Sequence, residues 1–284
     1  MYSKPSAPRS VGGVLDDGFR LGRAAFPKTW PLAFAAQILV ALPLVIFRVQ
    51  NGGGALGDGA QTNMMAMQSP GYSLLYLALV LVSAGFQNAI TAQNAGAAQS
   101  TDRTMGESLS IGFRLLPRTL LLGLLLALGF LLIALCFMIP GFFMDRTGRA
   151  LLIVLFLVPV GFYLGRVFLA NVIFVVEDSG AYASLQRSWQ LTKDNFWRTG
   201  AILAVLFIIL IVVLLVIGFL SGIVAATLGA NGAMSLTLVQ LISAAGNTLF
   251  IPFISAVLLS IYYDLRLRKE GTDPAARVDS VATR

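Results

Sequence analysis

One arginine inside an apolar segment is the residue of this sequence most suited to binding an anion. Arg166 lies eleven residues before Glu177, which is about 16 Å along a helix that rises about 1.5 Å per residue. A guanidinium at that depth in a membrane is costly and requires partners. Two interpretations stay open: an internal pair with Glu177, Asp264 or amide carbonyls, and a binding site for an anionic ligand or a lipid phosphate.

The residues of acid–base and metal chemistry are scarce in this chain. It contains no histidine, and its one cysteine, Cys136, lies in an apolar run. A Ser–His–Asp triad is therefore excluded, and the usual zinc ligands are missing. The adjacent carboxylates Asp16–Asp17 and Glu177–Asp178 do not face each other on a helix. We therefore expect no enzyme activity, no metal and no cofactor.

Further candidate residues lie in and around the stretch from Glu177 to Gly200, which joins two apolar segments. Its apolar residues Tyr182, Leu185 and Trp189 recur at helical spacing, and its charged residues lie off that stripe. This pattern predicts an amphipathic helix in the headgroup plane, which either braces the bundle or binds lipid headgroups. The candidate ligand or lipid contacts are Arg166, Glu177, Arg187, Trp189, Trp197, Arg198, Asp264 and Arg266.

These residues must be positioned by a membrane-embedded scaffold. Hydrophobic residues make up 57% of the 284 residues and charged residues only 12%, whereas soluble domains carry about 25% charged residues. A spanning helix needs about 20 apolar residues, and six segments meet that length. The predicted spans are 30–49, 71–93, 118–140, 150–176, 200–228 and 234–263.

The basic residues predict the orientation of these spans. Sixteen of the twenty lysines and arginines fall at the termini or in the connections that share their side, and three fall in the opposite loops. Cytoplasmic loops carry such an excess of basic residues, so both termini are expected in the cytoplasm. We expect a disordered tail at 1–10, a membrane domain at 11–270 and a cytoplasmic tail at 271–284. The net charge of +7 reflects this orientation and not binding to nucleic acid.

A weak threefold repeat organises the predicted spans. Gly18–Leu21, Gly112–Leu115 and Ser188–Leu191 resemble one another, and each precedes a basic residue followed by threonine. Thr104 and Glu107 have the spacing of a capping box at the start of the second copy. The predicted fold is an all-α integral membrane protein of six transmembrane helices. They form three hairpins, each preceded by a cytoplasmic, interfacial amphipathic helix.

Several of these segments resemble a known family. The resemblance is carried by Val14–Phe19, Arg187–Trp189, Phe196–Arg198 and Tyr262–Arg266, with Arg166 ahead of Glu177. They are similar to the membrane domain attached to some bacterial glycerophosphoryl diester phosphodiesterases, which also occurs alone in YciC-like inner-membrane proteins. The chain has no counterpart of the catalytic barrel of these enzymes. The resemblance therefore implies this architecture, a bacterial inner membrane and a lipid context, and it does not imply hydrolysis.

These observations lead to two expectations about function. The first is a non-enzymatic scaffold or regulator that acts on lipids or on a partner at the cytoplasmic face. The second is a transporter or channel for a lipid or a small anionic solute, with Arg166 as the anion contact. Membrane lipids with anionic headgroups are the expected partners, together with a protein partner or a second copy of the chain.

Overall fold

The computed structural model describes residues 5, 7–50, 70–101, 103–229 and 233–270. Every regular element in this part of the chain is an α-helix, so the prediction of an all-α protein is confirmed. The predicted C-terminal tail at 271–284 lies outside the described residues, as do residues 1–4 and 6 of the predicted N-terminal tail.

Six candidate membrane spans are present, as predicted, by helix length and apolar composition. They are long enough to cross a hydrocarbon layer of about 30 Å, so the chain is a multi-pass membrane protein. The helices that contain them are α1 (Val11–Gln50), α3 (Pro70–Ala98), α5 (Leu116–Gly141), α6 (Arg146–Val167) continued by α7 (Ala170–Glu177), α9 (Phe196–Leu228) and α10 (Ala233–Glu270).

Helix α1 corrects one part of the predicted arrangement. A separate interfacial helix was expected before a first span at 30–49, but α1 runs unbroken from Val11 to Gln50 through Pro27 and Pro31. Its N-terminal half is held by packing, because Leu21 is fully buried and Gly18 lies directly against α10. A Cβ atom at Gly18 would lie 2.7 Å from the Cα atom of Val257. The close contact with α10 therefore extends the helix beyond its apolar segment.

Two short helices precede later spans. Helix α4 (Met105–Arg114) comes before α5, and α8 (Ala181–Thr192) comes before α9. The predicted capping box at the start of α4 is confirmed: the Thr104 side chain accepts from the Glu107 N–H, and the Glu107 carboxylate accepts from the Thr104 N–H. These bonds satisfy donors that a helix start leaves free.

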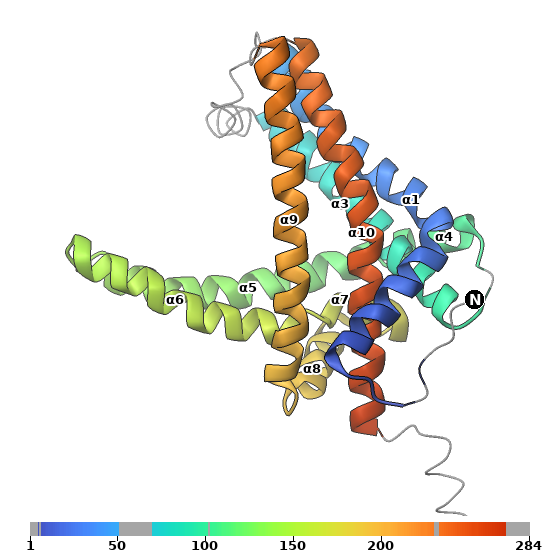
Figure 1. Ribbon diagram of the computed structural model, residues 1–284. Coiled ribbons are helices and arrows are strands. Elements are labelled where there is room, and N and C mark those ends of the chain that lie inside the picture. Colours follow the sequence, from blue (N-terminus) through green and yellow to red (C-terminus); the bar gives the residue numbers. More distant parts are fainter. Residues whose placement is uncertain (1–4, 6, 51–69, 102, 230–232, 271–284) are drawn as a thin grey trace, which may run out of the picture.

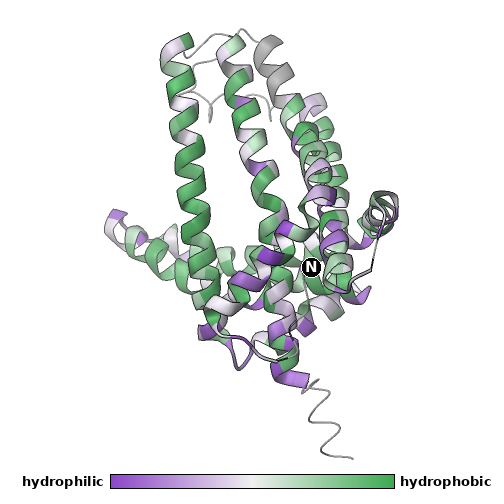
Figure 2. Ribbon diagram, turned by 45° about the vertical axis from the view of Figure 1, so that its right-hand side comes forward, coloured by the Kyte–Doolittle hydropathy of each residue, from purple (hydrophilic) through white to green (hydrophobic). Residues whose placement is uncertain are grey.

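The spans divide into a packed group and a projecting hairpin. Figure 1 shows α9 and α10 side by side, with α1 and α3 next to them, and the hairpin of α5 and α6 extending away from this group. Only 6% of the most apolar window of α5, and 6% of that of α9, is buried inside the protein. The upright helices in Figure 2 are hydrophobic over most of their length, and hydrophilic residues gather near the lower end. The exposed apolar surface therefore belongs to lipid.

Polar side chains within the packed group bind one another. The Asn94 amide donates to the Pro252 carbonyl oxygen over 3.1 Å, and the hydroxyls of Thr91 and Ser255 lie 3.1 Å apart. Ser108 on α4 donates to the Gln93 side chain on α3. These bonds join α3 to α10 and to α4, so the polar residues of α3 connect helices within the bundle.

Candidate functional site

Arg166 is enclosed by aromatic rings. It lies in the last turn of α6 with 8% of its surface exposed. The guanidinium carbon is 4.9 Å from the centroid of the Phe162 ring, 5.3 Å from that of Phe196 and 5.4 Å from that of Trp189. Cations within about 6 Å of a ring centroid are attracted by its negative face. Three rings from α6, α8 and α9 thus partly replace the water that burial removes from the guanidinium.

The carboxylates expected as partners of Arg166 do not contact it. Among the described residues, its Nε and Nη1 atoms have no hydrogen-bond partner. Glu177 and Asp264 bind other residues instead. The Arg166 carbonyl oxygen is engaged, because the Ser188 hydroxyl donates to it over 2.6 Å at the break between α6 and α7. Arg166 therefore contacts α8 through its backbone carbonyl oxygen, which binds Ser188, and through its guanidinium, which lies against the Trp189 ring. Two of its side-chain donors have no partner among the described residues.

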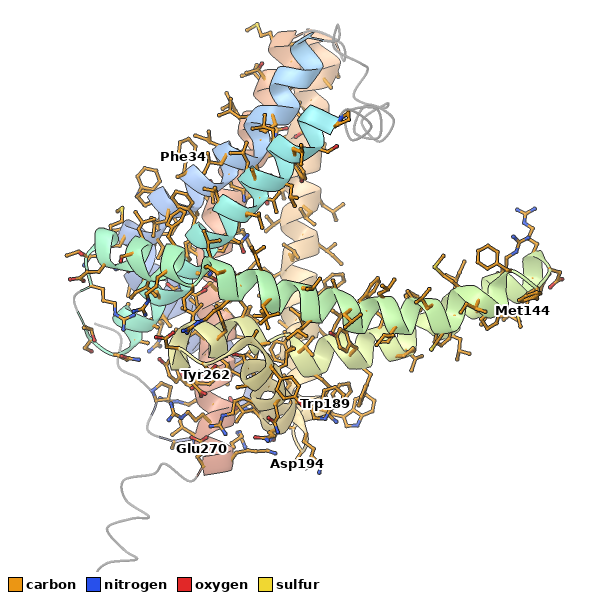
Figure 3. All side chains as sticks on the ribbon, turned by 180° about the vertical axis from the view of Figure 1, so that it is seen from behind. Phe34, Met144, Trp189, Asp194, Tyr262 and Glu270 are labelled. Carbon is orange, nitrogen blue, oxygen red and sulfur yellow. The ribbon has the colours of Figure 1, made fainter. Side chains whose placement is uncertain are left out.

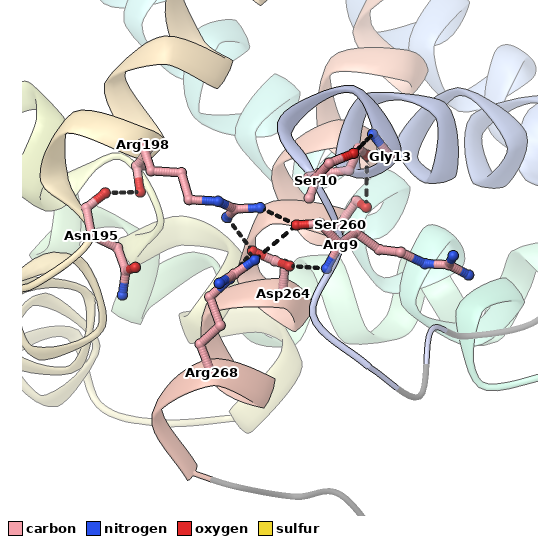
Figure 4. Close-up of polar contacts among 10 residues, drawn as sticks. Arg9, Ser10, Gly13, Asn195, Arg198, Ser260, Asp264 and Arg268 are labelled. Carbon is pink, nitrogen blue, oxygen red and sulfur yellow. Dashed lines mark hydrogen bonds and ion pairs between the residues drawn. The ribbon is translucent and has the colours of Figure 1, made fainter.

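Asp264 is the centre of the first charge cluster (Figure 4). Its carboxylate is almost fully buried and accepts from Arg198, at the start of α9, and from Arg268, over 3.1 Å. It also accepts from the backbone N–H of Arg9 over 2.8 Å. The Arg9 carbonyl oxygen accepts from Arg268 over 2.8 Å and from Arg198. One carboxylate thus joins α9, α10 and the segment before α1, including a residue of the predicted tail.

Glu177 lies in a second charge cluster between α7, α8 and α10. Tyr262 donates to its carboxylate over 2.7 Å, and Arg187 approaches the same oxygen at 3.7 Å. Arg187 also pairs with Glu270, which binds Arg266 over 2.8 Å. Two arginines and two glutamates neutralise one another here. Figure 3 shows Tyr262, Trp189 and Glu270 at the same end of the molecule.

Asp194 follows α8 and makes a third ionic contact with α10. The Lys269 ammonium lies 2.8 Å from its carboxylate and also donates to the Gln190 carbonyl oxygen over 2.6 Å. The hydrogen bond and charge of Lys269 hold the pKa of Asp194 below its ordinary value of 3.8, and Lys193 and Arg166 act in the same direction. This carboxylate is therefore surrounded by more positive than negative charge.

The predicted site residues lie around the same end of the bundle, but they do not converge on one cavity. Glu177, Arg187 and Arg266 share one cluster, whereas Asp264 and Arg198 share another. Trp197 is 87% exposed and contacts the neighbouring Phe196 ring at a centroid distance of 5.8 Å. Trp197 therefore points outward as a surface residue.

Several residues that surround Arg166 and Asp264 were not predicted from the sequence. Phe162 lies four residues before Arg166, which puts both on one helix face, so this ring could have been found from spacing. Phe196 and Trp189 reach Arg166 only through the packing of α8 and α9, and no local pattern reveals that contact. The Arg9 side chain pairs with Asp17 at 3.5 Å, but nothing in the residue type indicates the bonds that its backbone makes with Asp264, Arg198 and Arg268.

In the part of the chain that the structure describes, no group of three or more histidine, cysteine, aspartate or glutamate residues is placed to hold a metal ion. Asp264 accepts hydrogen bonds from Arg9, Arg198 and Arg268, and Glu177 accepts one from Tyr262 and forms an ion pair with Arg187. Carboxylates held in this way contribute to helix packing.

Comparison of the sequence with protein-family models assigns this chain to a family. A family model described as a domain of unknown function (DUF7847) matches residues 101–265. The chain belongs to the DUF7847 family. No curated protein and no solved structure matches it.

The DUF7847 match covers the chain from just before α4 to near the end of α10. It includes the ring-enclosed Arg166, the Glu177 carboxylate and Asp264, and it ends one residue before Arg266. The DUF7847 segment thus contains most of the two charge clusters. Arg9, Arg266, Arg268 and Glu270, which complete them, lie outside it.

Proposed function

We propose that this DUF7847 protein is a non-enzymatic scaffold or regulator at the cytoplasmic surface of a bacterial inner membrane, where it acts on anionic lipids or on a membrane partner. The observation that carries this proposal is the mutual pairing of the charged residues. Asp264 with Arg198 and Arg268, and Glu177 with Arg187, connect helices at one end of the bundle. Charged residues paired in this way hold helices together, whereas the charged residues of a translocation path would face a lumen.

The distribution of charge supports the proposed orientation. The charge clusters lie at the C-terminal end of α10, next to α8 and the start of α9. Basic residues on cytoplasmic loops set the orientation of membrane proteins, so this end is assigned to the cytoplasm with both termini. Short helices before α5 and α9 fit the interfacial helices of the proposed repeat. The architecture suits the phosphodiesterase membrane-domain family that the sequence resembles.

Lipid and partner binding can be measured directly. The purified protein is placed in nanodiscs that contain zwitterionic and anionic phospholipids, and the retained lipids are counted by native mass spectrometry. The proposal predicts enrichment of anionic lipid around the protein at low salt and weaker enrichment at high salt, because salt screens exposed charges. In parallel, a photo-crosslinker replaces the exposed Trp197 in cells. No anionic enrichment together with no crosslinked partner would remove the basis of the proposal.

A transporter for a lipid or small anion is the second candidate, and one observation favours it. Arg166 is buried, with two side-chain nitrogens that have no hydrogen-bond partner among the described residues. If it binds a moving anion, Arg166→Ala abolishes flux of that anion into liposomes while the protein still folds. Arg166→Lys provides the matched control, because it keeps the charge and the ring contacts. Equal flux in wild type and Arg166→Ala would exclude this role.

A further inference from the structure

A groove of about 580 Å³ lies where α8 crosses the base of the projecting hairpin. Its floor is set by a close contact between α5 and α6. The Tyr163 hydroxyl donates to the Leu126 carbonyl oxygen over 3.0 Å, and a Cβ atom at Gly129 would lie 2.7 Å from the Tyr163 ring carbon Cζ. Glycine at position 129 therefore permits the approach that shapes the groove.

The lining of this groove combines two kinds of chemistry. Leu125, Val167 and Leu185 are apolar. Gln186, Gln190 and Lys193, from α8 and the residue that follows it, are polar or charged. The structure gives the side chains of these three residues no hydrogen bond or ion pair within the described part of the chain. The groove thus combines apolar walls with a mouth of unused amide and ammonium donors.

The charge around the mouth favours a negative group. Asp194 is the acidic residue next to Lys193, and it is already bound by Lys269 at 2.8 Å. Lys193 and Arg166 also lie close enough to lower its pKa. Three cations therefore surround one carboxylate, and the adjacent cluster of two arginines and two glutamates is neutral. An anion at the mouth would meet uncompensated positive charge.

Two apolar residues of the groove, Leu125 and Val167, lie on the hairpin helices α5 and α6. The spans of α5 and α6 are largely exposed along their length, and exposed apolar helix surface in a membrane protein faces acyl chains. In Figure 3, Trp189 lies at the base of the hairpin and Met144 lies at its far tip. A molecule with a long apolar part and an anionic head therefore matches both kinds of lining at once.

We propose that this groove binds one anionic phospholipid of the surrounding membrane. Its phosphate lies against Lys193 and the amides of Gln186 and Gln190, and its acyl chains follow the apolar sides of α5 and α6. This inference rests on the proposed function, because both place α8 at an anionic membrane surface. It goes beyond that function by naming the ligand class and the residues that hold it.

Trp189 lines the groove and supplies a built-in reporter. Trp30 and Trp197 are replaced by phenylalanine, which leaves Trp189 as the one tryptophan, since the chain has three. The protein is then reconstituted in nanodiscs of zwitterionic lipid, and phosphatidylglycerol with brominated acyl chains is titrated in. Bromine quenches indole fluorescence only at short range. Binding in the groove predicts saturable quenching at a lower mole fraction for this lipid than for brominated phosphatidylcholine.

Two pairs of variants separate the groove from general surface charge. Lys193→Gln is expected to raise the half-saturating mole fraction about fivefold, the factor for about 1 kcal/mol from one lysine near an anionic surface. Arg23→Gln, which removes another exposed charge on α1, is expected to change it little. Gln186→Phe should block the groove without changing charge, whereas Ala183→Phe, on an exposed position of the same helix, should not.

The outcomes distinguish the groove from the broader function. Equal effects of Lys193→Gln and Arg23→Gln, or unaltered quenching in Gln186→Phe, would overturn the groove while leaving anionic lipid enrichment of the whole protein intact. Absence of that enrichment in the wild type, together with no crosslinked partner, would overturn the proposed function as well. Excess soluble glycerol phosphate is expected not to relieve the quenching. Relief would show that the site takes a free phosphate and would overturn the lipid assignment. Melting temperatures of all variants verify that each is folded.

Discussion

Helix α4 packs on α3 at a position that tolerates no side chain, and this contact gives a sharp test of the packing. A Cβ atom at Gly112 would overlap the carbonyl oxygen of Gly85 and would lie 2.9 Å from the backbone nitrogen and 3.0 Å from the Cβ atom of Ala89. Backbone atoms inside a helix cannot move aside as a flexible side chain can. Gly112→Ala therefore forces α4 away from α3.

The magnitude follows from two opposing effects. Alanine is about 1 kcal/mol better than glycine inside a helix, whereas overpacking a close contact costs up to about 3 kcal/mol. The net expectation is a loss of about 2 kcal/mol in the free energy of unfolding, which corresponds to about 4–8 °C in melting temperature for a chain of this size.

The matched control lies on the same helix. A Cβ atom at Gly106 would meet nothing within 4 Å, so Gly106→Ala is expected to leave the melting temperature unchanged or to raise it slightly. Both variants are compared with wild type in the same detergent by far-ultraviolet circular dichroism during heating. If Gly112→Ala melted at or above the wild-type temperature, the close approach of α3 and α4 would be refuted.

Three further predictions concern the charged residues. Asp264→Asn is expected to lower the free energy of unfolding by about 3 kcal/mol, because it removes the charge of a buried carboxylate that Arg198, Arg268 and the Arg9 N–H share. Asp178→Asn, at an exposed pair, should cost less than about 1 kcal/mol. Denaturant unfolding of both variants in detergent would contradict this if the two losses were equal. Arg166→Met should melt at or above the wild-type temperature, because it removes donors that lack partners and keeps side-chain volume; a marked fall in the melting temperature would mean that the ring contacts outweigh that gain. The wild type should be more stable than Asp194→Asn at neutral pH, because the ionised Asp194 carboxylate pairs with Lys269. This difference should vanish as the pH falls through the pKa of Asp194 in the folded protein, which lies below 3.8, because protonation removes the contribution of a carboxylate with a lowered pKa. A difference that persists in acid titrations of both proteins would contradict this.

The spans were predictable because length and apolar composition are local properties of the sequence. A run such as 200–228 has to be a helix in lipid, where every backbone polar group needs an internal partner. The capping box at Thr104 and Glu107 was predictable for the same reason, since it involves residues three apart. Helix bounds moved by several residues, because packing, as at Gly18, extends a helix beyond its apolar core.

The candidate site was only partly predictable. Its residues were identified by type, because charged side chains are rare within apolar runs and tryptophans collect at their interfacial ends. Their pairing could not be predicted, since the sequence left both Glu177 and Asp264 open as partners of Arg166. Which carboxylate an arginine meets depends on how α8 and α10 cross, and that crossing is fixed by contacts between residues far apart in sequence. The same limit applies to the groove, which exists only where three helices meet.

The bonds to the Arg9 backbone impose an order on the assembly of this protein. The Arg9 N–H donates to Asp264, 255 residues later in the chain. The Arg9 carbonyl oxygen accepts hydrogen bonds from Arg198 and Arg268, which are also made much later. During synthesis the first span therefore enters the membrane when its leading segment can contact α1, as Arg9 contacts Asp17 at 3.5 Å, but cannot yet contact Asp264. The bonds to Asp264, Arg198 and Arg268 form only when the last helix has been made and has docked against the first. The Arg9 contact is thus a closing step of biogenesis, and a chain truncated before α10 would leave the segment before α1 open to proteases.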